Sequence, residues 1–355
     1  YNRPTGEAQA LQEEISREIA ERLQLQTSSG PVQIAASKTV KPEAYEKLLR
    51  GRFAVRQYTP QSTQKAVEFY QQAIADDPGY GLAYAELAYT YRLLGASAFL
   101  DPSETNPKAL TAAQNALELD ENIGLAHLVL AEIKRDQWAW KGSEGEYNRA
   151  IQLSPNLAEA HEGYALYLSV LGQHDHAIVE MRRAKELDPL RLLTNISLGA
   201  VYYNARRFDE ANTALKDSLE LDANSPIAHA WLGIVEAGRQ SYRNAIGEYE
   251  RAVALGDKTT ATQCYYGFSL AKSGKHEDAN ALLSRLQKGK EFVSPVTLAI
   301  LFIGVGDKAN AFEALERAYQ ARDPQLQYLN VEPHFDDLRG DARFQNLVQR
   351  VGLAN

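Results

Sequence analysis

The sequence predicts an all-α fold, a right-handed α-solenoid of about eight helix-turn-helix units with a helical carboxy-terminal cap. Two amphipathic stretches flank a turn at Gly172 in the best-formed unit, Ala158–Arg191. A proline ends this unit at Pro189, because it has no N–H with which to continue the helix. The same ending occurs 34 residues earlier, at Pro155. Amphipathic pairing, turn and constant spacing together indicate stacked helical hairpins.

A small–large–small–proline pattern marks the second helix of each unit. The clearest copies are Ala66/Tyr70/Ala73/Pro78, Ser143/Tyr147/Ala150/Pro155 and Ala177/Met181/Ala184/Pro189. Because the pattern returns at a period of about 34 residues, the sequence resembles the tetratricopeptide repeat (TPR) family. This resemblance implies that each hairpin buries its apolar face only against its neighbours in the stack.

The expected organisation has four parts. Residues 1–25 contain an amphipathic helix, residues 26–42 form a linker, and residues 326–355 form the cap. The solenoid covers 43–325, with repeats at about 43–80, 81–123, 124–157, 158–191, 192–225, 226–259, 260–291 and 292–325. In the cap, Asp341 is expected to begin a last helix that covers the final repeat.

Charge and composition exclude several partners. The 355 residues carry a net charge of −8, which argues against nucleic acid or anionic lipid as the main partner. No apolar stretch is long enough for direct membrane insertion. The single cysteine, Cys264, permits no internal disulfide and is expected to be a buried, inert thiol.

Both ends of the chain carry a closer resemblance. The stretch ISREIAERL (15–23), PEAYEKLLRGRF (42–53) and the ending EPHFDDLRGDARFQNLVQRVGL (332–353) are similar to a group of bacterial multidomain signalling proteins. In that group a TPR array follows an α/β domain related to the amino-terminal domain of TolB. The resemblance implies that residues 1–25 are the tail of such a domain. It also implies an upstream Ser/Thr kinase, winged-helix or cyclase domain, on either side of a bacterial membrane.

No catalytic residue, metal or cofactor is expected. The chain lacks phosphate-binding, kinase, GxSxG and HExxH motifs. His174, Asp175 and His176 are interpreted as an exposed turn, because two histidines do not make a metal site. Trp138 and Trp140 are interpreted as a packed corner in preference to a surface anchor, although Trp138 stands where the repeat has its turn glycine. The recurrent His127, His161 and His229 are expected to pack between adjacent repeats.

The TPR resemblance implies an inner wall formed by set positions of each first helix. The candidate partner-binding residues on this wall are Glu132, Arg135, Asp136, Glu159, Glu162, Leu193, Ile196, Tyr203, Ile227, Ile234, Phe268 and Ile300. The acids are expected to steer a basic segment of a protein or peptide ligand, and the apolar positions to bury it. The Lys/Asn/Arg clamp by which chaperone-binding members hold a peptide carboxylate is missing from the matching positions.

The sequence leaves two questions open, the occupancy of the apolar wall and the role of the chain. The apolar downstream wall is either filled, by the carboxy-terminal tail from Leu326 to Leu353 or by a tightened superhelix, or left as a groove for an apolar or helical peptide. The chain is either an interaction module of a signalling protein or a scaffold that forms a homodimer. The dimer seam would be the stripe Leu11, Ile15, Ile19 and Leu23.

Overall fold

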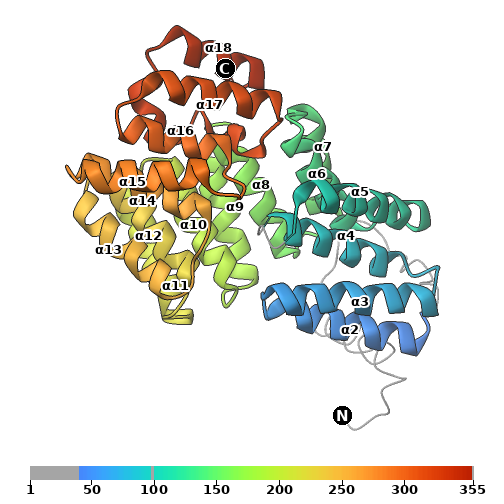
Figure 1. Ribbon diagram of the computed structural model, residues 1–355. Coiled ribbons are helices and arrows are strands. Elements are labelled where there is room, and N and C mark those ends of the chain that lie inside the picture. The colour runs from blue at the N-terminus through green and yellow to red at the C-terminus, as the bar shows by residue number, and fades with distance from the viewer. Residues whose placement is uncertain (1–39, 97–99, 354–355) are drawn as a thin grey trace. The chain divides into compact units, whose positions relative to one another are not determined.

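The structure, a computed structural model, describes residues 40–96 and 100–353. Within these ranges every regular element is helical and no strand occurs, which confirms the predicted all-α class. Helices α2 to α17 follow one another with short connections, and two 3₁₀ helices and a last α-helix complete the chain (Figure 1). The stripe Leu11, Ile15, Ile19 and Leu23 lies outside the described residues, so the predicted dimer seam stays a prediction.

The first of two compact units ends at Val129. Its helices are α2 (Pro42–Arg56), α3 (Pro60–Asp76), α4 (Gly81–Ala96), α5 (Pro102–Leu119) and the first part of α6 (Gly124–Asp136). Helix α3 begins with a capping box, in which the Thr59 side chain accepts from the Ser62 N–H and the Ser62 hydroxyl accepts from the Thr59 N–H. The ring of Tyr70 lies against Gly51, where an added Cβ would come within 2.4 Å of it, so α2 and α3 approach closely.

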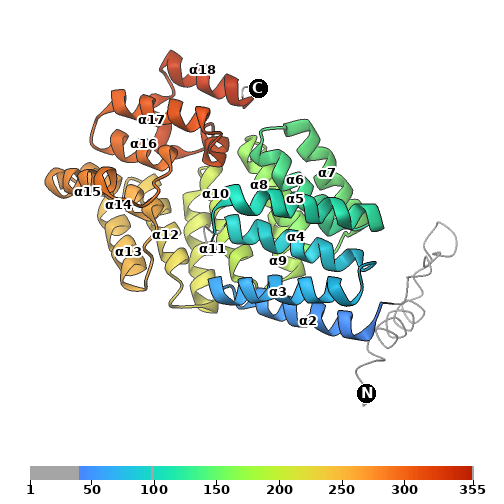
Figure 2. The same cartoon turned by 45° about the vertical axis from the view of Figure 1, so that its right-hand side comes forward.

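The second unit begins at Leu130 and contains the remaining elements (Figures 1 and 2). These are the end of α6, α7 (Trp140–Leu153), α8 (Ala158–Val170), α9 (His174–Leu187), α10 (Leu192–Asn204), α11 (Phe208–Leu221), α12 (Pro226–Gly238), α13 (Tyr242–Ala254), α14 (Thr260–Lys272), α15 (His276–Lys288), α16 (Pro295–Gly304), α17 (Lys308–Gln320), η2 (Pro324–Tyr328), η3 (Pro333–Leu338) and α18 (Ala342–Val351). No described helix combines the length and apolarity that a membrane crossing requires.

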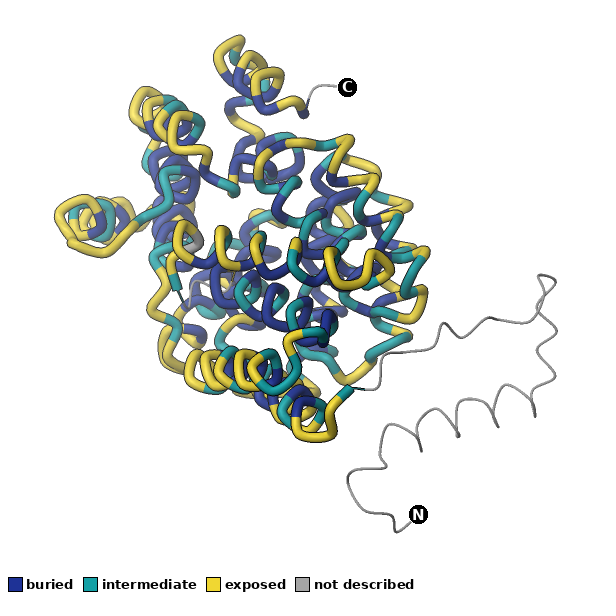
Figure 3. The backbone as a smooth tube through the Cα atoms, turned by 90° about the vertical axis from the view of Figure 1, so that its right-hand side faces the viewer, coloured by how far each residue is buried: buried dark blue, intermediate teal, exposed yellow. Residues whose placement is uncertain are grey.

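The small–large–small positions of the second helices form the core of the stack. Ala177, Met181 and Ala184 of α9 are all fully buried, and so are the matching positions of α3, α7 and α13. The first helices α8, α10 and α12 are buried over most of their length, since each packs against its own partner and against neighbouring hairpins. The second helices keep an exposed side as well as a buried stripe, and Figure 3 shows buried and exposed residues side by side along the chain.

Backbone conformation at the turns explains how the two helices of a hairpin reverse direction. Gly172, Gly274 and Gly306 have φ values of 75°, 91° and 86° between the helices of their hairpins. Arg206 and Gln240 take the same left-handed conformation, with φ of 62° and 63°, although it disfavours residues with a Cβ. The turn geometry is therefore kept even where the sequence has lost its glycine.

We predict opposite effects from two glycine-to-alanine substitutions. A Cβ at Gly304 would lie 2.7 Å from the Cα of Phe268, so Gly304→Ala should lower the free energy of unfolding by about 1–3 kcal/mol through overpacking. At Gly247 a Cβ meets no atom within 4 Å, so Gly247→Ala should raise it by about 0.5–1 kcal/mol through helix propensity. Urea unfolding followed by circular dichroism measures both. Equal effects of the two changes would contradict the close approach of α14 and α16.

We also predict that Cys264 is unreactive in the folded chain. The side chain is fully buried, and burial raises the pKa of its thiol to about 12, so almost no thiolate exists at mildly alkaline pH. A coloured disulfide reagent should therefore label the native chain only as it unfolds, and the urea-denatured chain at once. Immediate labelling of the native chain would contradict the burial.

Candidate functional site

The predicted partner-binding residues all lie on first helices, α6, α8, α10, α12, α14 and α16, and we call this surface the inner face. The buried members are Arg135, Glu162, Ile196, Tyr203, Ile234, Phe268 and Ile300. Glu132, Asp136, Glu159 and Leu193 are partly buried, and Ile227 is the exposed member, with 36% of its surface accessible. The inner face is thus closed at some positions and accessible at others.

A segment of the chain itself covers part of the inner face. This tail segment, Pro324–Leu338, comprises η2 and η3 and lies beside α10 and α14 in the second unit (Figure 2). Its apolar residues Leu326, Phe335 and Leu338 join a buried cluster with Phe268 and Ile300. Of the two alternatives that the sequence leaves open for the apolar wall, the structure shows the filled one.

A buried polar network joins the tail segment to α10 and α14. Tyr203 donates a 2.5 Å hydrogen bond to the Glu332 carboxylate, and Tyr265 donates one of 3.4 Å to its other oxygen. The Nδ1 of His334 lies 2.7 Å from the same carboxylate and 2.9 Å from the Tyr203 hydroxyl. The imidazole also meets the ring of Phe268 edge to face, with centroids 4.5 Å apart. Two predicted inner-face residues, Tyr203 and Phe268, therefore contact one short segment.

This environment shifts the ionisation of the groups it contains. Burial by itself would raise the pKa of Glu332, but the His334 ring and the hydroxyl of Tyr203 outweigh it and hold this pKa below its usual range. Burial, and next the Glu332 charge, raises the pKa of Tyr203 and Tyr265 well above the normal tyrosine value. The carboxylate is therefore ionised and both tyrosines remain neutral donors around neutral pH.

Ion pairs surround this network at its rim. Arg206, just beyond α10, holds Asp336 through two hydrogen bonds of 2.7 Å. Lys272 lies 3.1 Å from the Asp337 carboxylate, and Lys308 donates to the backbone carbonyl of Asp337 at 3.0 Å. Three cationic side chains therefore meet two consecutive acids of the tail segment.

The paired tryptophans belong to the same packed region. Trp138 has a φ of 60° at the turn-glycine position, so the residue that departs from the repeat pattern still keeps the turn conformation. Its ring is buried and stacks on Tyr319 of α17, with centroids 5.6 Å apart, and Arg322 covers its face. Trp140 donates from its indole nitrogen to the Val351 carbonyl at 3.0 Å. The turn between α6 and α7 thus contacts α17 through Trp138 and α18 through Trp140.

Several of the inner-face acids already have partners. Glu162 forms an ion pair with Arg191 and accepts hydrogen bonds from Thr194 at 3.1 Å and Ser197 at 2.8 Å. Asp136 lies 3.4 Å from Arg135, a weak contact. The negative charge of Glu162 is therefore largely compensated within the chain.

The accessible part of the inner face lies at the amino-terminal ends of three first helices. Glu159, Leu193 and Ile227 are spaced by 34 residues and so occupy equivalent positions on α8, α10 and α12. Helix α10 packs against both of the others, which places the three side chains in a row. The tail segment instead contacts Tyr203 and Arg206 at the carboxy-terminal end of α10 and Lys272 at that of α14.

The recurrent histidines make polar contacts both between repeats and within a hairpin. The Nε2 of His127 lies 3.0 Å from the carbonyl of Glu121 in the preceding repeat. His161 of α8 contacts Glu180 of its own hairpin at 2.7 Å through Nδ1 and the Pro155 carbonyl at 3.0 Å through Nε2. His229 of α12 contacts Glu248 of its own hairpin at 2.7 Å through Nδ1. His174, Asp175 and His176 form the first turn of helix α9. The sequence predicts them in the turn before that helix. Nowhere in residues 40–96 and 100–353 do three metal-ligating side chains cluster.

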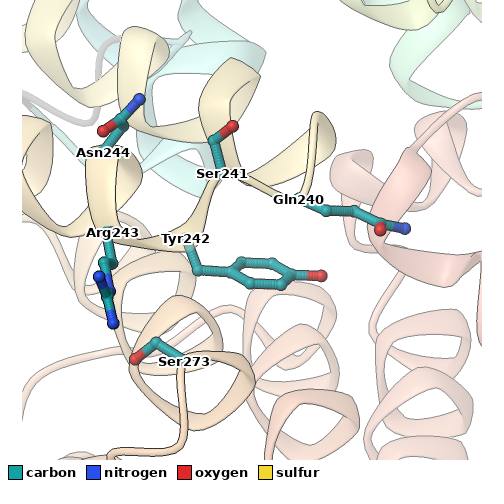
Figure 4. A pocket seen from close by; sticks show the side chains of 6 residues that line it. All are labelled: Gln240, Ser241, Tyr242, Arg243, Asn244 and Ser273. Carbon is teal, nitrogen blue, oxygen red and sulfur yellow. The ribbon is translucent and has the colours of Figure 1, made fainter.

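A shallow pocket of about 370 Å³ lies at the turn between α12 and α13. Its lining is Gln240, Ser241, Tyr242, Arg243, Asn244 and Ser273, as Figure 4 shows. No acid or histidine contributes to this lining, so the hydroxyls of Ser241 and Ser273 have no carboxylate or imidazole base within it to activate them.

Sequence reasoning missed the residues of the tail segment that contact the inner face. Glu332, His334 and Asp336 lie outside the repeat pattern. Arg206 stands at the turn position where the repeat has a glycine, so the pattern assigns it no side-chain role. One signal was present: a histidine and three acids surround a single phenylalanine in EPHFDD (332–337), an unusual composition for a segment that only covers an apolar face.

Comparisons with known proteins agree with the fold. No protein-family model matches the chain. Over 157 residues, 44% of the chain, it is 29% identical to the transcriptional regulator HilA of Salmonella typhimurium, and it covers 28% of that protein. It is 28% identical to putative adenylate cyclase 3 of Rhizobium meliloti over 37% of the chain and 23% of that protein. Human tetratricopeptide repeat protein 13 is 31% identical over 30% of the chain and 12% of its own length. The chain thus spans less than a third of each relative.

Two solved structures show the same architecture. The Cut9–Hcn1 structure of the APC/C aligns with a TM-score of 0.57 and 17% identity, over 87% of this chain and 55% of that one. The type IV pilus biogenesis factor PilW aligns with a TM-score of 0.50 and 18% identity, over 61% of this chain and 96% of that one. Repeat pattern, helical pairs and these likenesses agree, and the chain has the tetratricopeptide-repeat fold.

Proposed function

We propose that the chain is a protein-interaction module that binds an extended segment of a partner on its inner face, as the docking arm of a bacterial signalling protein. The observation that supports this proposal is that the inner face binds the chain's own tail segment. Side chains from α10 and α14 hold one short stretch of non-repeat chain through hydrogen bonds, ion pairs and ring contacts. A surface with these contacts has the chemistry that peptide recognition requires.

The row of Glu159, Leu193 and Ile227 supplies the accessible part of this surface. Two apolar side chains beside an acid, on three adjacent helices, suit a segment that alternates apolar and basic residues. The titratable groups Tyr203, Glu332 and His334 are buried and bonded to one another, so they are not open to a substrate. A binding role therefore fits the inner face better than catalysis does.

The names of two relatives support the signalling context. One is called a transcriptional regulator and another a putative adenylate cyclase, which are two of the output classes that the resemblance at both chain ends implies. The full coding sequence upstream of Tyr1 tests this part of the proposal. A winged-helix, cyclase or kinase domain there would support it, and an unrelated domain would remove it.

Placing charge in the accessible row should abolish partner binding. We expect Leu193→Asp/Ile227→Asp to weaken binding of the best peptides from a displayed random library at least tenfold, because each buried apolar contact is replaced by a desolvated carboxylate. Fluorescence anisotropy with the selected peptides measures the affinity.

The matched control for that experiment is Val179→Asp/Val253→Asp. These valines are 63% and 48% exposed on second helices, so the control adds the same charges away from the inner face. It should bind as the unaltered chain does. Equal loss in both variants, or none in either, would rule out the row as the binding surface.

Neutralising the inner-face acids should slow association. Of the four acids, Glu162 is buried and paired with Arg191, so the variant neutralises two partly buried acids instead, Glu132→Gln/Glu159→Gln. We expect a several-fold lower association rate and a flatter dependence on salt, with Glu220→Gln/Glu313→Gln as the outward-facing control. Stopped-flow mixing at low and high ionic strength measures both. An unchanged salt dependence would remove electrostatic steering.

A further inference from the structure

We propose that residues Val331–Leu338 are a displaceable strap, and that their seat on α10 and α14 recognises an extended acidic segment of another protein. The seat comprises Tyr203, Arg206, Tyr265, Phe268 and Lys272. This inference rests on the proposed function and names a second class of ligand, held at the ends of the first helices opposite the accessible row.

Two anchors enclose the strap. On its amino-terminal side, Leu326 and Leu329 are fully buried against α16 and α17. On its carboxy-terminal side, α18 is bound to α17 by two 2.8 Å hydrogen bonds from Arg350 to Glu316, and to the Trp140 indole through Val351. The strap is thus a short loop between fixed ends, and it can leave its seat while both ends stay in place.

The strap combines core residues with charged residues. Val331, Phe335 and Leu338 are buried, and the ring of Phe335 lies against Phe344 of α18, with centroids 5.8 Å apart. Asp336 and Asp337 lie at the rim, with side chains 49% and 57% exposed. Exposed ion pairs add little to stability, but they select the charge and register of what binds.

The strap also leaves its seat imperfectly filled. The Nε2 of His334 is buried and has no hydrogen-bond partner among the described residues. A buried polar group without a partner destabilises the state that buries it. A ligand that places an apolar ring in the same contact with Phe268 avoids this cost and so binds more tightly than the strap does.

The seat therefore specifies the chemistry of its ligand. A carboxylate meets the two tyrosine hydroxyls, a ring lies against Phe268, and two consecutive acids meet Arg206 and Lys272. The class of ligand is an extended acidic segment with one aromatic residue between its acids. The strap competes with it as a tethered ligand, at an effective concentration on the order of millimolar.

The test releases the strap without altering the seat. In the full chain, Asp336→Lys/Asp337→Lys repels Arg206 and Lys272, and a fluorescent synthetic peptide of residues 330–340 serves as the probe in anisotropy measurements. We expect the peptide to bind this variant at least tenfold more tightly than the unaltered chain. Hydrogen exchange should become faster at 331–338 and stay unchanged at 326–329 and 342–351.

Matched variants and a second peptide decide the outcome. Asp209→Lys/Asp217→Lys makes the same charge change on α11 and should behave as the unaltered chain. The strap variant should bind the peptide but not a probe with lysines at 336 and 337. Adding Arg206→Glu/Lys272→Glu to the strap variant restores opposite charges between strap and seat, so the strap should return to its seat and exclude both probes. If the strap variant binds the peptide no more tightly than the unaltered chain does, or binds both probes equally, the proposal is overturned.

A folding failure is also decisive. If both Asp336→Lys/Asp337→Lys and the milder Asp336→Asn/Asp337→Asn lose their helical signal, the strap is an integral part of the fold and the proposal is wrong. The accessible row is unchanged in these variants, so a library peptide that still binds there keeps the proposed function while the strap proposal fails.

Discussion

The close approach of the two helices in each hairpin is the constraint on which the structure depends. Alanine or glycine at the contact positions lets an aromatic or long side chain of the partner helix lie directly against backbone, as Tyr249 does at Gly233 and Tyr70 at Gly51. Because a protein interior is packed like a crystal, these positions accept little change in volume. Leu215 at Gly199 repeats this arrangement in the α10–α11 hairpin. Hairpins built in this way present equivalent side chains of their first helices at constant spacing.

The second-helix core could be predicted from the sequence because its determinants are local. Ala177, Met181 and Ala184 occupy one stripe of one helix, and periodicity alone assigns them to the buried side. The candidate inner-face residues could be placed on first helices for the same reason. Their accessibility could not, since Tyr203 and Glu332 are 129 residues apart and no periodic signal links them. Arg206 was missed because the pattern assigns its position to glycine, whereas the structure uses its side chain as well as its turn conformation.

Burial and charge are combined differently in the two parts of the inner face. The amino-terminal ends of α8, α10 and α12 pair accessible apolar residues with an acid, whereas the carboxy-terminal ends of α10 and α14 surround a buried carboxylate with neutral donors and cations. The low dielectric of the second region strengthens each polar contact and makes each unmatched group expensive. Selectivity is therefore expected to be greater at the carboxy-terminal ends, and tolerance of varied ligands greater at the row.

The contact between Tyr203 and Glu332 has a consequence for synthesis of the chain. A ribosome completes α10 well before it adds residues 324–338, so Tyr203 is in place long before Glu332 exists. Hairpins that rely on neighbours can form in sequence order, but closure across this distance must come last. During that interval Tyr203 and Phe268 face solvent, and the nascent protein presents the same surface that the finished one covers.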